Sequence, residues 1–173
     1  AGDKPRAHCI HFDIVVSGWN YNGPRWDRVK RDYSRYMDAT IEFNNHGPQG
    51  FDIRDPQKDK RRNLVHGQRV SNMHDGHCQG IRWGLANADP TTMRKAMTRA
   101  YEICHESAVK AASRPKVQLE GRDGDVWVHN GKLGTECTQG RHRAAMFANE
   151  MAKYLREQGA TVQVHFETMF KGA

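Results

Sequence analysis

The fold is decided by the stretch GTECTQGRHRAAMFANEMAKYLREQGATVQVHF, residues 134–166. Over residues 139–158 its apolar side chains follow helical spacing on one face, made of Ala144, Phe147, Ala148, Met151 and Leu155. Gly159 follows as the residue best suited to end a helix in the left-handed conformation. The alternating run TVQVHF (161–166) is typical of a strand. Strand, loop, helix, glycine and strand in this order predict a βαβ unit with parallel strands and a right-handed crossover.

The segments before this unit extend it to a small mixed α/β sheet with long polar loops. Apolar or alternating runs predict strands at residues 8–16, 39–43, 115–120, 125–129 and 132–137. Asn130-Gly131 is the strongest two-residue hairpin signal, so residues 132–137 are expected to return antiparallel to residues 125–129.

Helical spacing predicts two further helices, at residues 24–37 and from Pro90 to about Ser113. The apolar stripe of the second helix comprises Met93, Met97, Ala100, Tyr101, Cys104, Ala108 and Ala111. Its cysteine is therefore expected in the core.

The length of 173 residues suits one domain with additions. We expect a strand–helix extension at residues 1–38 and an α/β domain at residues 39–173. Residues 44–89 are dense in Gly, Pro, Asn, His and charge, and an irregular insertion is expected near 68–90. Such long loops are usually functional or stabilised by a partner.

The composition favours a polyanionic partner. Lys and Arg outnumber Asp and Glu by 27 to 20, which gives a net charge of +7 and a pI near 9.4. The hydrophobic share of 37% and the mean hydropathy of -0.88 predict a thin core. We expect RNA or a ribonucleoprotein as partner, together with protein partners.

Four cysteines are spread widely without a CxxC pair, which favours free thiols in a reducing intracellular compartment. No run of about 18 apolar residues occurs, so membrane insertion is not expected. The chain begins at Ala1 instead of Met, which fits either an arbitrary boundary of the sequence or a mature end left after removal of a targeting peptide. The expected compartment is an organelle matrix such as that of the mitochondrion, or the cytoplasm.

The loop at residues 136–144 has the chemistry of an anion site. It leads into a helix N-terminus, whose unpaired N–H groups and dipole attract negative charge. Gly140 lets the backbone curl around a ligand, and Arg141 and Arg143 add cations, of which an arginine fork can grip two phosphate oxygens. His142 adds a donor when it is protonated, and a thiol at Cys137 is expected to be more thiolate-like than usual.

The spacing Cys-x-x-Gly-x-x-Arg in this loop resembles the signature of the cysteine-dependent phosphatases. The resemblance covers about eight residues and implies Cys137 as the nucleophile and Arg143 as the phosphate clamp. Asp125 or Asp123, upstream, would serve as the general acid.

A longer resemblance joins two motifs. ECTQGRHRA (136–144) is similar to the loop G-C-T-G-G-x-H-R-S in the C-terminal domain of the RNase adapter protein RapZ, with matches at Cys137, Thr138, Gly140, His142 and Arg143. The second motif of that family, D-[V/I]-R with Asn-Pro and then a leucine and a glycine, resembles DIRDP (52–56) followed by Leu64 and Gly67. The resemblance covers residues 39–170.

The RapZ resemblance implies binding rather than chemistry. That family binds small RNAs and an amino-sugar phosphate and acts as an adapter. The residues carried over to the anion pocket are Arg54, Cys137, Thr138, Gly140, His142 and Arg143, to which Arg141 adds charge. A phosphorylated small molecule is therefore a second candidate ligand. Nothing in the chain resembles the Walker A loop of the adapter's kinase half, and no cofactor is expected.

Basic segments interleaved with aromatic residues point to RNA contact. The candidates are Arg28 and Arg31 in the first predicted helix and Lys58, Lys60, Arg61 and Arg62 in the irregular region. The histidine-rich runs at 8–11 and 73–78 lack the usual zinc spacing, so no metal site is predicted.

Three functions follow from these patterns. The first is a non-catalytic RNA- or phosphate-binding domain of a ribonucleoprotein assembly, for example an organellar ribosome-like particle. The second is a cysteine-dependent phosphatase. The third is a structural subunit of a protein complex with a vestigial pocket, because Glu136 places a carboxylate beside the loop.

Overall fold

The computed structural model describes residues 10–18, 36–42, 64–65, 68–69, 90–119, 126–137 and 143–166. Its strands are β1 (Ile10–Gly18), β2 (Ala39–Glu42), β3 (Leu64–Val65), β4 (Gln68–Arg69), β5 (Val117–Leu119), β6 (Val126–Cys137) and β7 (Thr161–Phe166). Its long helices are α3 (Pro90–Ala112) and α4 (Arg143–Glu157). The predicted α/β class is confirmed.

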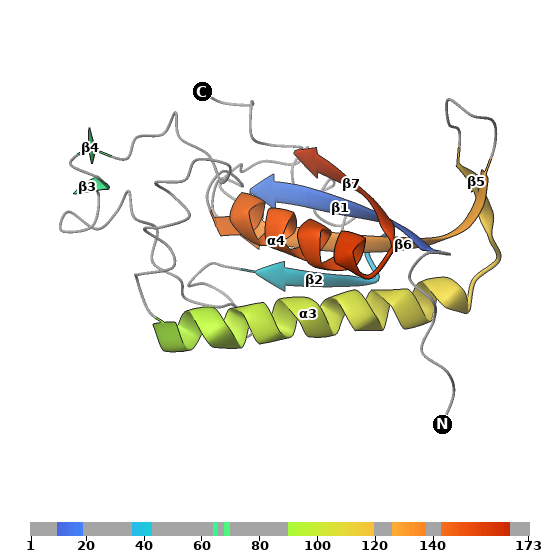
Figure 1. Cartoon of the computed structure of the whole chain (residues 1–173), viewed down its shortest axis with the longest axis horizontal. Helices are drawn as coiled ribbons and strands as arrows, with labels where there is room; N and C mark the ends of the chain where they lie inside the picture. The colour runs from blue at the N-terminus through green and yellow to red at the C-terminus, as the bar shows by residue number, and fades with distance from the viewer. Residues whose placement is uncertain are drawn as a thin grey trace, which may run out of the picture.

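The main sheet has five strands and is mixed (Figure 1). Its order is β2-β6-β1-β7 with all neighbours parallel, and β5 pairs antiparallel with β6. The predicted βαβ unit is present as β6, α4 and β7, and β1 lies between its two strands. β3 and β4 form a separate two-stranded sheet.

Both long helices pack on one face of the sheet, with α4 over β6, β1 and β7 and α3 along β6 and β2 (Figure 1). Side chains on a strand alternate between faces, and every second residue of β1 is fully buried: Ile10, Phe12, Ile14 and Val16. All five residues predicted for the apolar face of α4 are buried.

The stripe of α3 is confirmed at Ala100, Cys104 and Ala111, and it also includes Ala96 and Ile103. Met93, Met97 and Ala108 are partly buried against the same core. Burial raises the pKa of the Cys104 thiol to about 12, so this cysteine is a neutral core residue, as predicted.

The predicted hairpin at Asn130-Gly131 is wrong. β6 runs without interruption through both residues, which pair in parallel with His11 and Phe12 of β1. A Cβ at Gly131 would lie 2.6 Å from the Phe12 ring and 2.8 Å from Ser107 Oγ. A glycine is therefore required here because β6 lies close to Phe12 and Ser107, and not because the chain turns. The antiparallel partner of β6 is β5, joined to it through residues 120–125.

The end of α4 agrees with the sequence. Gly159 has a φ of 91°, and its N–H donates to the Arg156 carbonyl oxygen. The N–H of Ala160 donates to the Leu155 carbonyl oxygen. These two bonds form the glycine cap that reverses the chain into β7.

Asp38 connects three elements at the amino end of the sheet. Its carboxylate accepts hydrogen bonds from Ser107 Oγ (2.8 Å), from Arg114 Nη2 (2.9 Å) and from the Lys132 N–H (2.9 Å). Burial raises the pKa of Asp38, but these hydrogen bonds and the charge of Arg114 outweigh it and lower the pKa below the usual value. β2 is thereby fixed to α3 and β6.

Several predictions fall wholly or mostly outside the described residues. These are the helix at 24–37, except for its last two residues, most of the irregular region at 44–89, and the insertion near 68–90. The division of the chain near residue 38 stays a prediction, and β1 of the first segment lies inside the main sheet. Neither described long helix combines the length and apolar character needed to cross a membrane.

Candidate functional site

The carboxyl ends of four parallel strands meet at one edge of the sheet, and α4 begins there (Figure 1). Gly18 of β1 pairs with Cys137 of β6, and Glu42 of β2 pairs with Glu136. In open α/β sheets ligands bind at this edge. We refer to it as the carboxyl edge.

A side-chain hydrogen bond fixes the end of β6 against the start of α4. Thr135 is fully buried, and its Oγ1 donates to the Ala144 carbonyl oxygen at 2.9 Å. Since alternate residues share a face, Thr135 and Cys137 both lie on the helix-facing side of β6. Cys137 is accordingly 2% exposed and belongs to the core cluster.

The first residue of α4 is the predicted phosphate clamp. Arg143 is 4% exposed at the end of the helix where the dipole is positive. Glu136 is 1% exposed on β6, beside Cys137. By the alternation of side chains along β6, Glu136 lies on the face opposite to Thr135 and Cys137. The carboxyl edge therefore carries a buried guanidinium at the N-terminus of a helix of 15 residues, and a buried carboxylate on the other face of β6.

The structure brings two of the predicted anion-binding residues, Cys137 and Arg143, to the carboxyl edge. The other predicted anion-binding residues lie outside the described part of the chain: Arg54, Thr138, Gly140, Arg141 and His142. The predicted RNA contacts Arg28, Arg31, Lys58, Lys60, Arg61 and Arg62 also lie outside it, as do Asp123 and Asp125, the proposed acids of a phosphatase.

Sequence reasoning missed a polar network on the face of the sheet opposite the helices. Asp13 Oδ1 lies 2.9 Å from His165 Nε2 and 3.3 Å from His11 Nε2. His11 Nδ1 lies 2.7 Å from Thr161 Oγ1. With its amide turned to satisfy both polar atoms, Asn130 Nδ2 donates to Asp13 Oδ2 at 3.2 Å. The network therefore joins β1, β6 and β7.

The electrostatics of this network keep Asp13 ionised. Burial raises the pKa of its carboxyl, but the hydrogen bonds and positive charges of His11 and His165 outweigh that effect and lower the pKa to about 2. The signal in the sequence is the alternation of His11 and Asp13 on one strand. It could not reveal His165, which is far away in the chain. In the described ranges no group of three or more His, Cys, Asp or Glu residues is arranged to hold a metal ion.

The chain matches no protein-family model, and a search of curated proteins found none with significant similarity. The resemblance to the RapZ C-terminal domain therefore stays a prediction.

Proposed function

We propose that this chain is an RNA-binding domain that holds RNA phosphates at the carboxyl edge without catalysing a reaction, as a component or adapter of a ribonucleoprotein assembly. The observation that carries the proposal is the start of α4 at that edge with Arg143 as its first residue. Helix N-termini and arginine forks are the usual phosphate ligands of proteins. The net charge of +7 supports a polyanion as the partner.

Two features favour binding over phosphoryl transfer. Ala144, fully buried after Arg143, has no hydroxyl to assist a leaving thiolate. The carboxylate of Glu136 would repel the phosphate dianion of a monoester more strongly than the single charge of an RNA phosphodiester.

The test is equilibrium binding of a fluorescein-labelled single-stranded RNA of about 20 nucleotides, by anisotropy, between about 50 and about 200 mM KCl. We expect affinity to fall steeply with salt, by about 0.7 in the logarithmic slope for each phosphate contacted. Replacing Lys58, Arg61 and Arg62 together by alanine should lower the slope by about 2. Arg141→Ala should weaken binding, and Arg143→Lys, which keeps the charge in a buried position, should weaken it less than Arg143→Ala.

The other two functions give different results in the same experiments. Hydrolysis of an aryl phosphate that disappears in Cys137→Ser would establish a phosphatase and contradict the proposal. Absence of both RNA binding and hydrolysis in the folded wild-type chain would leave a structural subunit and equally contradict it.

A further inference from the structure

At the amino end of β6, β5 and the first part of β6 extend from the four parallel strands as a two-stranded ribbon with two unlike faces (Figure 1). Residues directly opposite in an antiparallel pair share a face, and Gln118 is opposite Trp127. One face is aliphatic and carries Val117, Leu119, Val126 and Val128. The other carries Gln118 and Trp127, and by alternation Lys116 and His129. We call the second face the Trp127 face.

Trp127 lies in a paired strand, but it is largely exposed to solvent. Its backbone pairs with Gln118 of β5, and the residue is 60% exposed. An exposed aromatic ring of this size offers a surface on which a nucleic-acid base can stack. Its neighbours on this face are an amide, an imidazole and an ammonium group, which suit a ligand that carries negative charge and hydrogen-bonding groups. The exposed valines, Val117 and Val126, lie on the other face.

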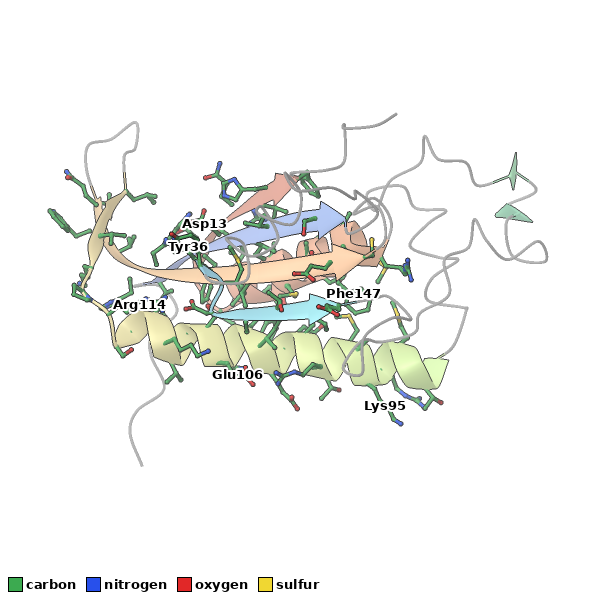
Figure 2. The ribbon with its side chains drawn as sticks, turned by 180° about the vertical axis from the view of Figure 1, so that it is seen from behind. Asp13, Tyr36, Lys95, Glu106, Arg114 and Phe147 are labelled. Carbon is green, nitrogen blue, oxygen red and sulfur yellow. The ribbon has the colours of Figure 1, made fainter. Side chains whose placement is uncertain are left out.

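The end of α3 supplies positive charge beside the Trp127 face. His129 Nδ1 lies 3.1 Å from the Arg114 carbonyl oxygen, which places the last turn of α3 against this part of β6. Figure 2 shows Arg114 at this end of α3. Lys110, Arg114 and Lys116 are exposed there. Asp38 offsets the charge of Arg114 through a salt bridge. Lys110 Nζ donates to the Asp38 carbonyl oxygen at 2.6 Å, so the exposed ammonium group of Lys116 is the cation that the Trp127 face offers to an anion.

An exposed indole beside an ammonium group fits single-stranded nucleic acid, because bases stack on the ring while cations hold the phosphates. We propose that the Trp127 face binds single-stranded RNA, with one base stacked on Trp127 and an adjacent phosphate on Lys116. This rests on the proposed function, which makes RNA the ligand, and adds a second contact at the opposite end of the sheet. The connection at 120–125 carries three carboxylates and one arginine, so the RNA is expected at the base of the ribbon.

The test compares ribbon variants in the anisotropy experiment with a labelled oligouridine of about 20 nucleotides. Trp127→Ala should weaken binding by about 10-fold or more, and Trp127→Phe by less than about threefold, since a phenyl ring still stacks. Lys116→Ala should reduce the logarithmic salt slope by about 0.7. Val126→Ser is the matched control on the aliphatic face and should leave the affinity unchanged.

Crosslinking of the wild-type chain to a 4-thiouridine oligonucleotide provides a reading without any substitution, and the crosslinked peptide should contain Trp127. Loss of all RNA binding in the wild type would overturn the proposed function. RNA binding that is equal in folded Trp127→Ala and wild type, with crosslinks confined to other segments, would overturn this inference alone. A dimer in sedimentation that Val126→Ser dissociates, with no effect of Trp127→Ala on RNA, would identify the ribbon as a protein interface and also overturn it.

Discussion

At the scale of single residues, Gly131 fixes how closely β6 approaches Phe12 of β1 and Ser107 of α3. No side chain larger than hydrogen fits between β6 and the atoms of Phe12 and Ser107. The Asn-Gly pair predicted a turn because this pair is common in two-residue hairpin turns. The packing requirement comes from Phe12 and Ser107, which are distant in the chain, and no local pattern contains it.

Gly131→Ala is expected to destabilise the fold by about 1–3 kcal/mol, because the added methyl overpacks the core. The measurement is the urea midpoint of unfolding. Phe12→Leu is the matched second change: it removes ring atoms from the clash, so the double variant should lose less than the sum of the two single variants. A neutral or stabilising Gly131→Ala would contradict the packing described here.

Asp13 makes stability depend on acid pH. Its folded pKa of about 2 lies below the ordinary value of 3.8. The carboxylate therefore contributes stability above about pH 4, and this contribution is lost as the pH falls toward 2. Because Asp13 is partly exposed, we expect its share to be about 1–2 kcal/mol.

The check is the free energy of unfolding of wild type and Asp13→Asn at pH values from about 6 to about 2. The wild type should lose more stability over this range than the variant, and the two curves should converge at the acid end. His165→Gln should reduce the difference. Parallel curves would show that Asp13 is not held ionised by its histidine neighbours.

At the scale of elements, prediction succeeded where hydrophobic periodicity is strong. The strands predicted at 8–16, 39–43 and 161–166 correspond to β1, β2 and β7, and both predicted helices after residue 89 are present. α4 is described from Arg143, and the predicted start at residues 139–142 lies outside the described residues. Two predicted strands merged into β6, because its continuity depends on pairing with β1. The hydrogen bonds that connect elements, such as those accepted by Asp38, had no local signal in the sequence.

Asp38→Ala should destabilise the fold by about 2–4 kcal/mol, since it leaves Ser107, Arg114 and the Lys132 N–H without their shared acceptor. Asp38→Asn retains one carbonyl acceptor and should cost less. Hydrogen exchange gives the local reading: amides of β2 and of the last turn of α3 should lose protection before those of α4. Equal loss in all elements would show that Asp38 does not join them specifically.

At the scale of the whole molecule, the carboxyl ends of the four parallel strands lie at one edge of the sheet. Both long helices pack on one face of the sheet, and the polar network around Asp13 lies on the other face. The order β2-β6-β1-β7 could not be predicted, because its neighbours are far apart in the chain and carry no local signal of pairing. The anion-binding chemistry expected of the strand-to-helix connection stays a prediction, because Gly140, Arg141 and His142 lie outside the described residues. The burial of Arg143 and Glu136 came only from the fold.

Binding of RNA phosphates where α4 begins, as we propose, is tested by the amide NMR spectrum of the ¹⁵N-labelled chain titrated with single-stranded RNA at low salt. We expect the largest, salt-sensitive shifts at Cys137 and at Arg143, Ala144 and Ala145, because these amides lie at the carboxyl edge. Saturable shifts elsewhere, with the resonances of this edge unmoved throughout the titration, would contradict it.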